Sequence, residues 1–343
     1  MVKYRQQENI YPLDRGTKHL IMVIHIVSGE KDNGSVLPRL KTCSQNDLLC
    51  HWRYKYDPPE FQTLLASVDD SSTFHIGYFR DDPKEMPVFV ASAGGIKKEE
   101  TFSQGFSSHA KINPMGGNLF GAVYNYIQAL ILKAEPFQQT ALHKIKESLH
   151  VHATIKTQVT NVFEYVLLDN AWFFPCRQTQ HYQFMYNILQ EIDFPLENKT
   201  PQMKSRDKKK LTATFHGAGL VVPYNKDTEV GYREIPETTQ SLKRIFENII
   251  KAQKGDSQTA KDKAFDTLQE LVTNVQFAND EGDTGMGLEL GLNAFLYCSP
   301  CLDSTVKHLL SVAYGLLDRE FYGTVLLAHL SRRSINEDLF KAK

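Results

Sequence analysis

Three carboxylates lie within four residues near the C-terminal end of this 343-residue chain, at Asp280, Glu281 and Asp283. Gly285 and Gly287 follow them, and glycine allows backbone conformations that other residues avoid. Carboxylates placed close together can act as general acids and bases or can bind a cation. This acidic cluster is therefore the candidate site for chemistry in the chain.

The residues on either side of the acidic cluster predict two packed elements that meet at it. Apolar side chains recur at spacings of three and four from Phe265 to Val275, which is typical of a helix with one buried face. A second apolar segment begins at Leu288 and reaches Phe295. A run of acids is most often a solvated loop, but its position between two apolar segments favours a defined corner.

The spacing of the oxygen ligands argues against calcium at the cluster. Asn279, Glu281 and Asp283 resemble the first alternating ligands of an EF-hand loop. That loop requires Gly at its sixth position and Glu at its twelfth, where this chain has Thr284 and Leu290. We therefore expect no metal ion there.

The cysteines and histidines do not predict a metal site either. The five cysteines are odd in number and scattered, which suits a reducing compartment: Cys43, Cys50, Cys176, Cys298 and Cys301. The pair at Cys298 and Cys301 has no second pair and no histidine at ligand spacing, so both are expected to be small buried hydrophobes. His150 and His152 lack acidic companions and are interpreted as surface residues.

The overall charge excludes a general attraction to nucleic acid or to an acidic membrane. The chain has 39 Lys and Arg residues against 40 Asp and Glu residues, a net charge of −1. The basic residues 204–210 are interpreted as a solvated linker, although such stretches also serve nuclear import or contact phosphate. The apolar run at residues 20–27 is far too short to cross a membrane, and no signal peptide is recognisable.

Strand-like and helix-like patterns predict an α+β fold. Short alternating or apolar segments predict a mainly antiparallel sheet with flanking helices in the N-terminal part, from residues 51–56, 61–68, 74–79 and 87–90. Helical spacing predicts helices at residues 119–132, 140–149, 238–252, 260–277, 287–297, 304–317 and 322–330. The C-terminal part is therefore expected to be helix-rich, with a small sheet over residues 212–235 that includes a strand at 215–222.

The same patterns predict two domains, residues 1–195 and 196–343, with a boundary near residues 190–205. Residues 1–45 and 151–187 are atypical parts of the first domain. The former contain few readable patterns. The latter are rich in aromatic and amide side chains but have no clean period, so we expect them to pack weakly and to be dispensable.

Long strings of low degeneracy occur in both halves of the chain. They are residues 49–54 (Leu-Cys-His-Trp-Arg-Tyr), 56–63 (Tyr-Asp-Pro-Pro-Glu-Phe-Gln-Thr), 77–81 (Gly-Tyr-Phe-Arg-Asp), 206–209 (Arg-Asp-Lys-Lys), 214–223 (Thr-Phe-His-Gly-Ala-Gly-Leu-Val-Val-Pro), 230–234 (Val-Gly-Tyr-Arg-Glu) and 275–291. Together they resemble the histone PARylation factor family over residues 48–130 and 196–333.

Two regions depart from the family pattern. Residues 1–45 lack the N-terminal helical part that the family has, and residues 151–187 interrupt a region that the family crosses directly. The composition of the second region suits either a retained non-coding stretch or a lineage-specific insertion.

The resemblance implies an activity and the residues that carry it. The family completes the active site of DNA-damage-responding poly(ADP-ribose) polymerases and directs them toward serine acceptors, including histones, on the chromosome in the nucleus. By this resemblance Glu281 matches the catalytic base, Asp280 matches a polymerase contact, and Tyr232 and Arg233 match another part of the docking surface, with Arg233 near Glu281.

The resemblance also implies what the chain lacks. The chain alone would bind no cofactor, because NAD is the substrate of the partner polymerase, and it would not be an enzyme by itself. We expect no membrane contact and no sequence-specific binding of nucleic acid.

The residues themselves leave two functions open. A serine hydroxyl is neutral at pH 7 and needs a base to take its proton, whereas an acidic acceptor is already an anion, so one carboxylate could be lent to a partner. Alternatively, two of the acids Asp280, Glu281 and Asp283 could act as the carboxylate pair of a stand-alone hydrolase. A hydrolase requires a deep sugar pocket beside the acids, so exposed acids would count against it.

Overall fold

A computed structural model of the chain describes residues 2–4, 49–50, 53–67, 71–103, 105–133, isolated positions between 136 and 147, and 196–333. The expectations for residues 151–187, for residues 20–27 and for His150 and His152 lie outside these described residues, as do those for residues 1–45 apart from 2–4. The chain forms two compact units that are interleaved in sequence: residues 1–12, 34–114 and 205–343, and residues 13–33 and 115–204. The division into domains at residue 195 stays a prediction.

The predicted antiparallel sheet is present. Its order is β1 (Val2–Tyr4), β2 (Phe61–Ser67), β3 (His75–Phe79), β4 (Phe89–Ala93) and β7 (Asn113–Gly116), and a separate hairpin pairs β5 (Phe102–Ser103) with β6 (Phe106–Ser107). Strands β2, β3 and β4 pair antiparallel, with Phe61 opposite Phe79 and Phe79 opposite Phe89. Gly77 allows close approach, because a Cβ there would lie 2.3 Å from the Gln62 carbonyl oxygen.

The strand expected at residues 51–56 is wrong for its described part, because residues 53–60 form turns before β2. The Arg53 side chain is buried and donates hydrogen bonds to the carbonyl oxygens of Pro58 at 2.9 Å and Pro59 at 3.0 Å. The Asp57 carboxylate accepts a hydrogen bond from the Tyr54 backbone N–H at 2.9 Å. Side chains therefore satisfy backbone groups that strand pairing would otherwise satisfy, and they hold the turn.

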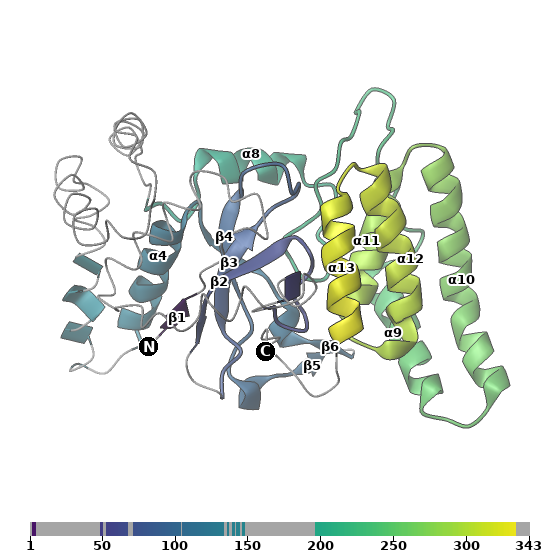
Figure 1. The fold of residues 1–343 in the computed structure, drawn as a ribbon, viewed down its shortest axis with the longest axis horizontal. Helices are drawn as coiled ribbons and strands as arrows, with labels where there is room; N and C mark the ends of the chain where they lie inside the picture. Colours follow the sequence, from purple (N-terminus) through teal and green to yellow (C-terminus); the bar gives the residue numbers. More distant parts are fainter. Residues whose placement is uncertain are drawn as a thin grey trace, which may run out of the picture. The chain divides into compact units, whose positions relative to one another are not determined.

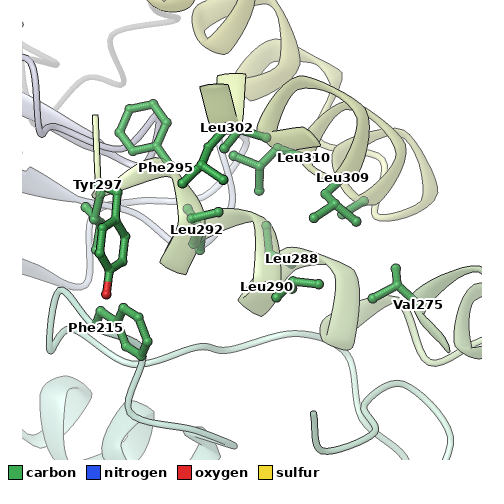
Figure 2. Packing of buried hydrophobic residues seen from close by; sticks show 14 of the residues in the cluster. Phe215, Val275, Leu288, Leu290, Leu292, Phe295, Tyr297, Leu302, Leu309 and Leu310 are labelled. Atoms are coloured by element: carbon green, nitrogen blue, oxygen red, sulfur yellow. The ribbon is translucent and has the colours of Figure 1, made fainter. Parts of the chain in front are cut away.

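The helices predicted in the C-terminal part are confirmed and pack around one of their number. They are α9 (Thr239–Gln253), α10 (Gln258–Asp280), α11 (Thr284–Phe295), α12 (Pro300–Leu316) and α13 (Glu320–Arg332) (Figure 1). Every residue of α11 from Gly285 to Phe295 is buried. Figure 2 shows the α11 leucines in a cluster with Val275, Leu309 and Leu310 from the neighbouring helices. Burial of one leucine side chain stabilises the fold by about 1.5–3 kcal/mol. Because α11 is buried along nearly its whole length, it is the centre of this core.

The helices begin where local caps predict. Thr238 and Ser257 accept hydrogen bonds from the backbone N–H of Ser241 and Ala260 at the starts of α9 and α10. In the other compact unit, Asn118 caps helix α4 (Leu119–Ile131) in the same way. Among the described helices, none is long and apolar enough to cross a membrane.

The small sheet expected over residues 212–235 is reduced to one bridge between Thr212 and Leu220. Gly217 and Gly219 have φ angles of +86° and +79°, which an extended strand does not have, so residues 215–222 turn instead. The Phe215 backbone N–H donates to the Asn293 side chain at 2.8 Å rather than to a neighbouring strand.

The basic linker expected at residues 204–210 is mostly helix, α8 (Pro201–Lys209). Arg206 gives the tertiary reason, because its guanidinium is buried and forms two hydrogen bonds of 2.6 and 2.7 Å with the Asp81 carboxylate. It also donates to the Ala218 carbonyl oxygen at 2.7 Å. A basic residue that looked solvated is thus an anchor of the core.

Candidate functional site

The acidic cluster forms a corner between α10 and α11, which we call the acidic corner (residues 280–283). Asp280 is the last residue of α10, Glu281 is its C-cap, and α11 begins at Thr284. Gly282 takes the left-handed conformation, with φ of +90°, which reverses the chain within the corner. The Asp283 N–H donates to the Ala278 carbonyl oxygen at 2.7 Å and closes the corner. Asp280 and Glu281 are left exposed, whereas Asp283 is buried.

A loop from a distant part of the sequence is attached to this corner by its backbone. The Gly231 N–H donates to the Asp283 carboxylate at 3.0 Å. In return, the Gly285 N–H donates to the Gly231 carbonyl oxygen at 3.0 Å. The two hydrogen bonds fix the loop at the residue just before Tyr232 and Arg233.

Arg233 lies between the two acids of the corner. Its guanidinium forms an ion pair with Glu281 and a second one with the Asp283 carboxylate, at 2.9 Å. The expectation that Arg233 lies near Glu281 is confirmed. The hydrogen bond to Glu281 is the main cause that raises the pKa of Arg233, and the nearby charges of both acids act in the same direction.

The exposure of these side chains separates their roles. The Glu281 side chain is 61% exposed and the Arg233 side chain 44%, whereas the Asp283 side chain is 9% exposed. Asp283 is therefore a fixed partner for the loop, and Glu281 presents its carboxylate to solvent. This exposure counts against the stand-alone hydrolase, which needs its acids beside a deep sugar pocket.

Tyr232 points inward, unlike its neighbour Arg233. Its hydroxyl donates a hydrogen bond to the Glu289 carboxylate at 2.8 Å, and burial raises the pKa of Tyr232. The second oxygen of Glu289 accepts from the Thr212 hydroxyl at 2.9 Å. Sequence reasoning missed Glu289 and Thr212, although one signal was available: Glu289 is a single acid inside the otherwise apolar segment 286–292.

The described residues do not form a cluster of three or more His, Cys, Asp and Glu side chains suited to a metal ion. Cys298 and Cys301 are free thiols that are half-buried, so the expectation of small buried hydrophobes holds only in part. The Cys301 sulfur lies 3.2 Å from the Ser299 hydroxyl oxygen. What the described geometry offers for chemistry is the exposed carboxylate of Glu281 beside the guanidinium of Arg233.

Sequence comparison identifies relatives over most of the chain. The family model described as Histone PARylation factor 1 matches residues 28–166 and 177–333. The protein named Histone PARylation factor 1 from Bos taurus is 39% identical over 284 residues, which is 83% of this chain and 67% of the relative. Its namesake from Danio rerio is 39% identical over 292 residues, 85% of this chain and 69% of the relative, and that from Mus musculus 37% over 284 residues.

The extent of the match corrects the boundaries of the resemblance. The family model continues through residues 151–166 and resumes at residue 177, so the interruption expected over 151–187 is confined to residues 167–176. The match also begins at residue 28, so it includes part of residues 1–45, for which the residue pattern alone predicts a departure from the family. With both halves matched and the relatives aligned along most of its length, the chain belongs to the histone PARylation factor family.

Proposed function

We propose that this chain is an accessory factor of ADP-ribose transfer that lends Glu281 to the active site of a DNA-damage-activated poly(ADP-ribose) polymerase. The observation that carries the proposal is the presentation of Glu281. Its side chain is 61% exposed on a hydrogen-bonded corner between two helices, where a second protein can reach it. An exposed base has no substrate pocket of its own, but it can complete the pocket of a partner.

The proposed chemistry explains why the borrowed group is a carboxylate. When nicotinamide leaves NAD, the ribose C1 carbon becomes electrophilic and the serine Oγ forms a bond to it. Glu281 accepts the hydroxyl proton as that bond forms, and general-base help of this kind is worth about 10²–10⁴-fold in rate. An acidic acceptor is already an anion at neutral pH, so its modification does not require Glu281.

The docking surface in this proposal comprises Tyr232, Arg233 and Asp280 around the base. Arg233 and Asp280 are exposed, and arginine is a frequent energetic anchor at protein interfaces. The names of the relatives support histones and poly(ADP-ribose) polymerases as the partners. The proposed place of action is the nucleus, on the chromosome. NAD belongs to the polymerase, and this chain contributes residues rather than a cofactor.

Substitution of Glu281 by Gln tests the proposal, because Gln keeps the size and polarity of Glu but does not accept the proton. With a damage-activated polymerase and NAD, we expect Glu281→Gln to abolish modification of serine peptides and to leave modification of glutamate peptides and polymerase binding intact. Glu270→Gln is a matched control, since Glu270 is an exposed acid of the same helix α10. Serine transfer at the wild-type rate by folded Glu281→Gln protein would overturn the proposal.

A further inference from the structure

We infer that Glu289 is a positioning residue for this reaction: it anchors Tyr232 and thereby sets the place of Arg233 beside the Glu281 base. The inference rests on the proposed function and adds a residue to it. Glu289 lies on α11, more than one turn of helix after the acidic corner, and its side chain points to Tyr232.

The surroundings of Glu289 are unusual for an acid. The residue is 9% exposed within a helix whose neighbouring side chains Leu288 and Leu290 are apolar and buried. Its hydrogen-bond donors are two neutral hydroxyls, and no Lys or Arg of the described residues forms an ion pair with it. A buried carboxylate without a cation is costly, and an apolar side chain would be cheaper at this place. We therefore attribute the presence of a carboxylate at this position to its hydrogen bonds with Tyr232 and Thr212.

Glu289 and Gly285 hold the two ends of the Tyr232 side chain. The hydroxyl is bound to Glu289, and a Cβ at Gly285 would lie 2.9 Å from the Tyr232 ring. These two residues are four apart on α11 and so lie on one face of the helix, about one turn from each other. The Tyr232 side chain thus lies along α11, and moving it away from the helix would break its hydrogen bond to Glu289.

The position of Tyr232 constrains that of Arg233, because Arg233 is the next residue in the chain. Gly231, on the other side of Tyr232, is fixed by its hydrogen bonds to Asp283 and Gly285. With Gly231 and Tyr232 both held, the Arg233 side chain is directed toward Glu281 and Asp283. Displacement of a catalytic arrangement by about 1 Å can cost about 100-fold in rate, so a remote anchor of this kind has a measurable effect.

The Thr212 hydroxyl completes the arrangement by fixing the carboxylate itself. It occupies the Glu289 oxygen that Tyr232 does not use. Thr212 belongs to the only described bridge in this region, where the Leu220 N–H donates to the Thr212 carbonyl oxygen at 3.0 Å. One oxygen of Glu289 is therefore held by Tyr232 in the docking loop (residues 231–233), and the other by Thr212 in the segment that precedes it.

Three variants test the inference: Glu289→Leu, Tyr232→Phe and the double variant, each assayed at a saturating concentration with the polymerase. We expect either single change to lower serine transfer about 10- to 100-fold while transfer to glutamate peptides is unchanged. Because both remove the same hydrogen bond, the double variant should be no worse than the poorer single variant. Glu289→Gln retains an acceptor for the Tyr232 hydroxyl and should restore most of the activity.

The controls separate this inference from the function on which it rests. If Glu281→Gln retains serine transfer, the proposed function is wrong. If Glu281→Gln is inactive but folded Glu289→Leu and Tyr232→Phe work at the wild-type rate when saturating, only the positioning role is overturned. Should Glu289→Leu fail to fold, Tyr232→Phe decides alone, since it removes a single oxygen atom. Additive losses in the double variant would also overturn the coupling.

Discussion

Two carboxylates in the same compact unit, each paired with a basic side chain, differ in their exposure to solvent. At the acidic corner, Glu281 pairs with Arg233 and its side chain is 61% exposed. In the turn before β2, Asp57 pairs with His75 and its side chain is 3% exposed. Water screens the first pair, which therefore adds little to stability and leaves the carboxylate available to a partner. The second pair has no such screening, and its groups hold the fold together.

The buried pair is surrounded by partners on all sides. The His75 Nδ1 atom lies 2.7 Å from the Thr73 carbonyl oxygen, and Nε2 lies 2.9 Å from the Asp57 carboxylate. Each ring nitrogen of His75 therefore has its own oxygen partner inside the fold. The Tyr54 ring stacks on it with the centroids 4.0 Å apart. The side chains of the buried pair are therefore fully engaged, whereas Glu281 is not enclosed.

The largest effect that the comparison predicts is the loss of stability in Asp57→Ala. This change leaves the buried His75 ring without its partner at Nε2 and removes the acceptor of the Tyr54 N–H and the Thr63 hydroxyl. Breaking a buried pair from one side costs about 3–5 kcal/mol in free energy of unfolding. Denaturant titration measures the loss, with Asp280→Ala at the exposed corner as the control. Equal stability of the two variants would remove the distinction between the regions.

A smaller loss of stability, with a large loss of binding, is expected for Gly285→Val. A Cβ at Gly285 would lie 2.9 Å from the Tyr232 ring and 3.0 Å from the Gly231 carbonyl oxygen. Overpacking of this kind costs about 1–3 kcal/mol. Because the displaced residues carry Arg233, polymerase affinity should fall even where the protein remains folded. Titration of the folded variant with the polymerase checks this. An unchanged affinity would show that docking does not depend on the packing of Gly231 and Tyr232 against Gly285.

The pH dependence of stability distinguishes a buried from an exposed acid. Burial raises the pKa of Glu60 above its ordinary value of 4.5, although a hydrogen bond from Tyr314 acts against it. The folded protein thus retains a proton that the unfolded chain has already lost, so stability falls as the pH rises from 4.5 through the higher folded-state pKa. Glu60→Gln does not ionise, and this part of the decline should disappear.

Glu281→Gln is the exposed counterpart in that experiment. Unfolding midpoints across a pH series should have the wild-type slope for Glu281→Gln and a shallower slope for Glu60→Gln. Parallel curves for all three proteins would show that Glu60 makes no contribution to the pH dependence.

The smallest effect on stability is expected for Arg233→Ala. Its ion pair with Glu281 is exposed and screened by solvent, and Asp283 keeps its hydrogen bond from the Gly231 N–H, so the thermal midpoint should change little. Affinity for the polymerase should nevertheless fall at least about tenfold, because the guanidinium is removed from the docking surface. Calorimetric titration measures the affinity, and Arg244→Ala, on the exposed side of α9, is the matched control. A loss of stability without a loss of affinity would show that Arg233 supports the fold and does not belong to the docking surface.

Local sequence patterns were sufficient for much of the fold. Helices α9 to α13 begin and end within a few residues of the predicted bounds, because apolar spacing and N-terminal caps act over only a few residues. The break at residues 280–283 was visible for the same reason, as an apolar period that stops at acids and glycines. The strands β2, β3 and β4 also follow from local alternation and turn residues.

Tertiary structure alone decided where polar side chains find their partners. Arg206 looked like part of a solvated linker until Asp81, 125 residues away in sequence, was brought against it. Glu289 likewise depends on Tyr232, 57 residues away, and its pattern could not reveal that hydroxyl. Hydrophobic periodicity reports which face of an element is buried but not which distant donor meets a buried acceptor. The corner was therefore readable from the sequence, whereas the network that orients it required the fold.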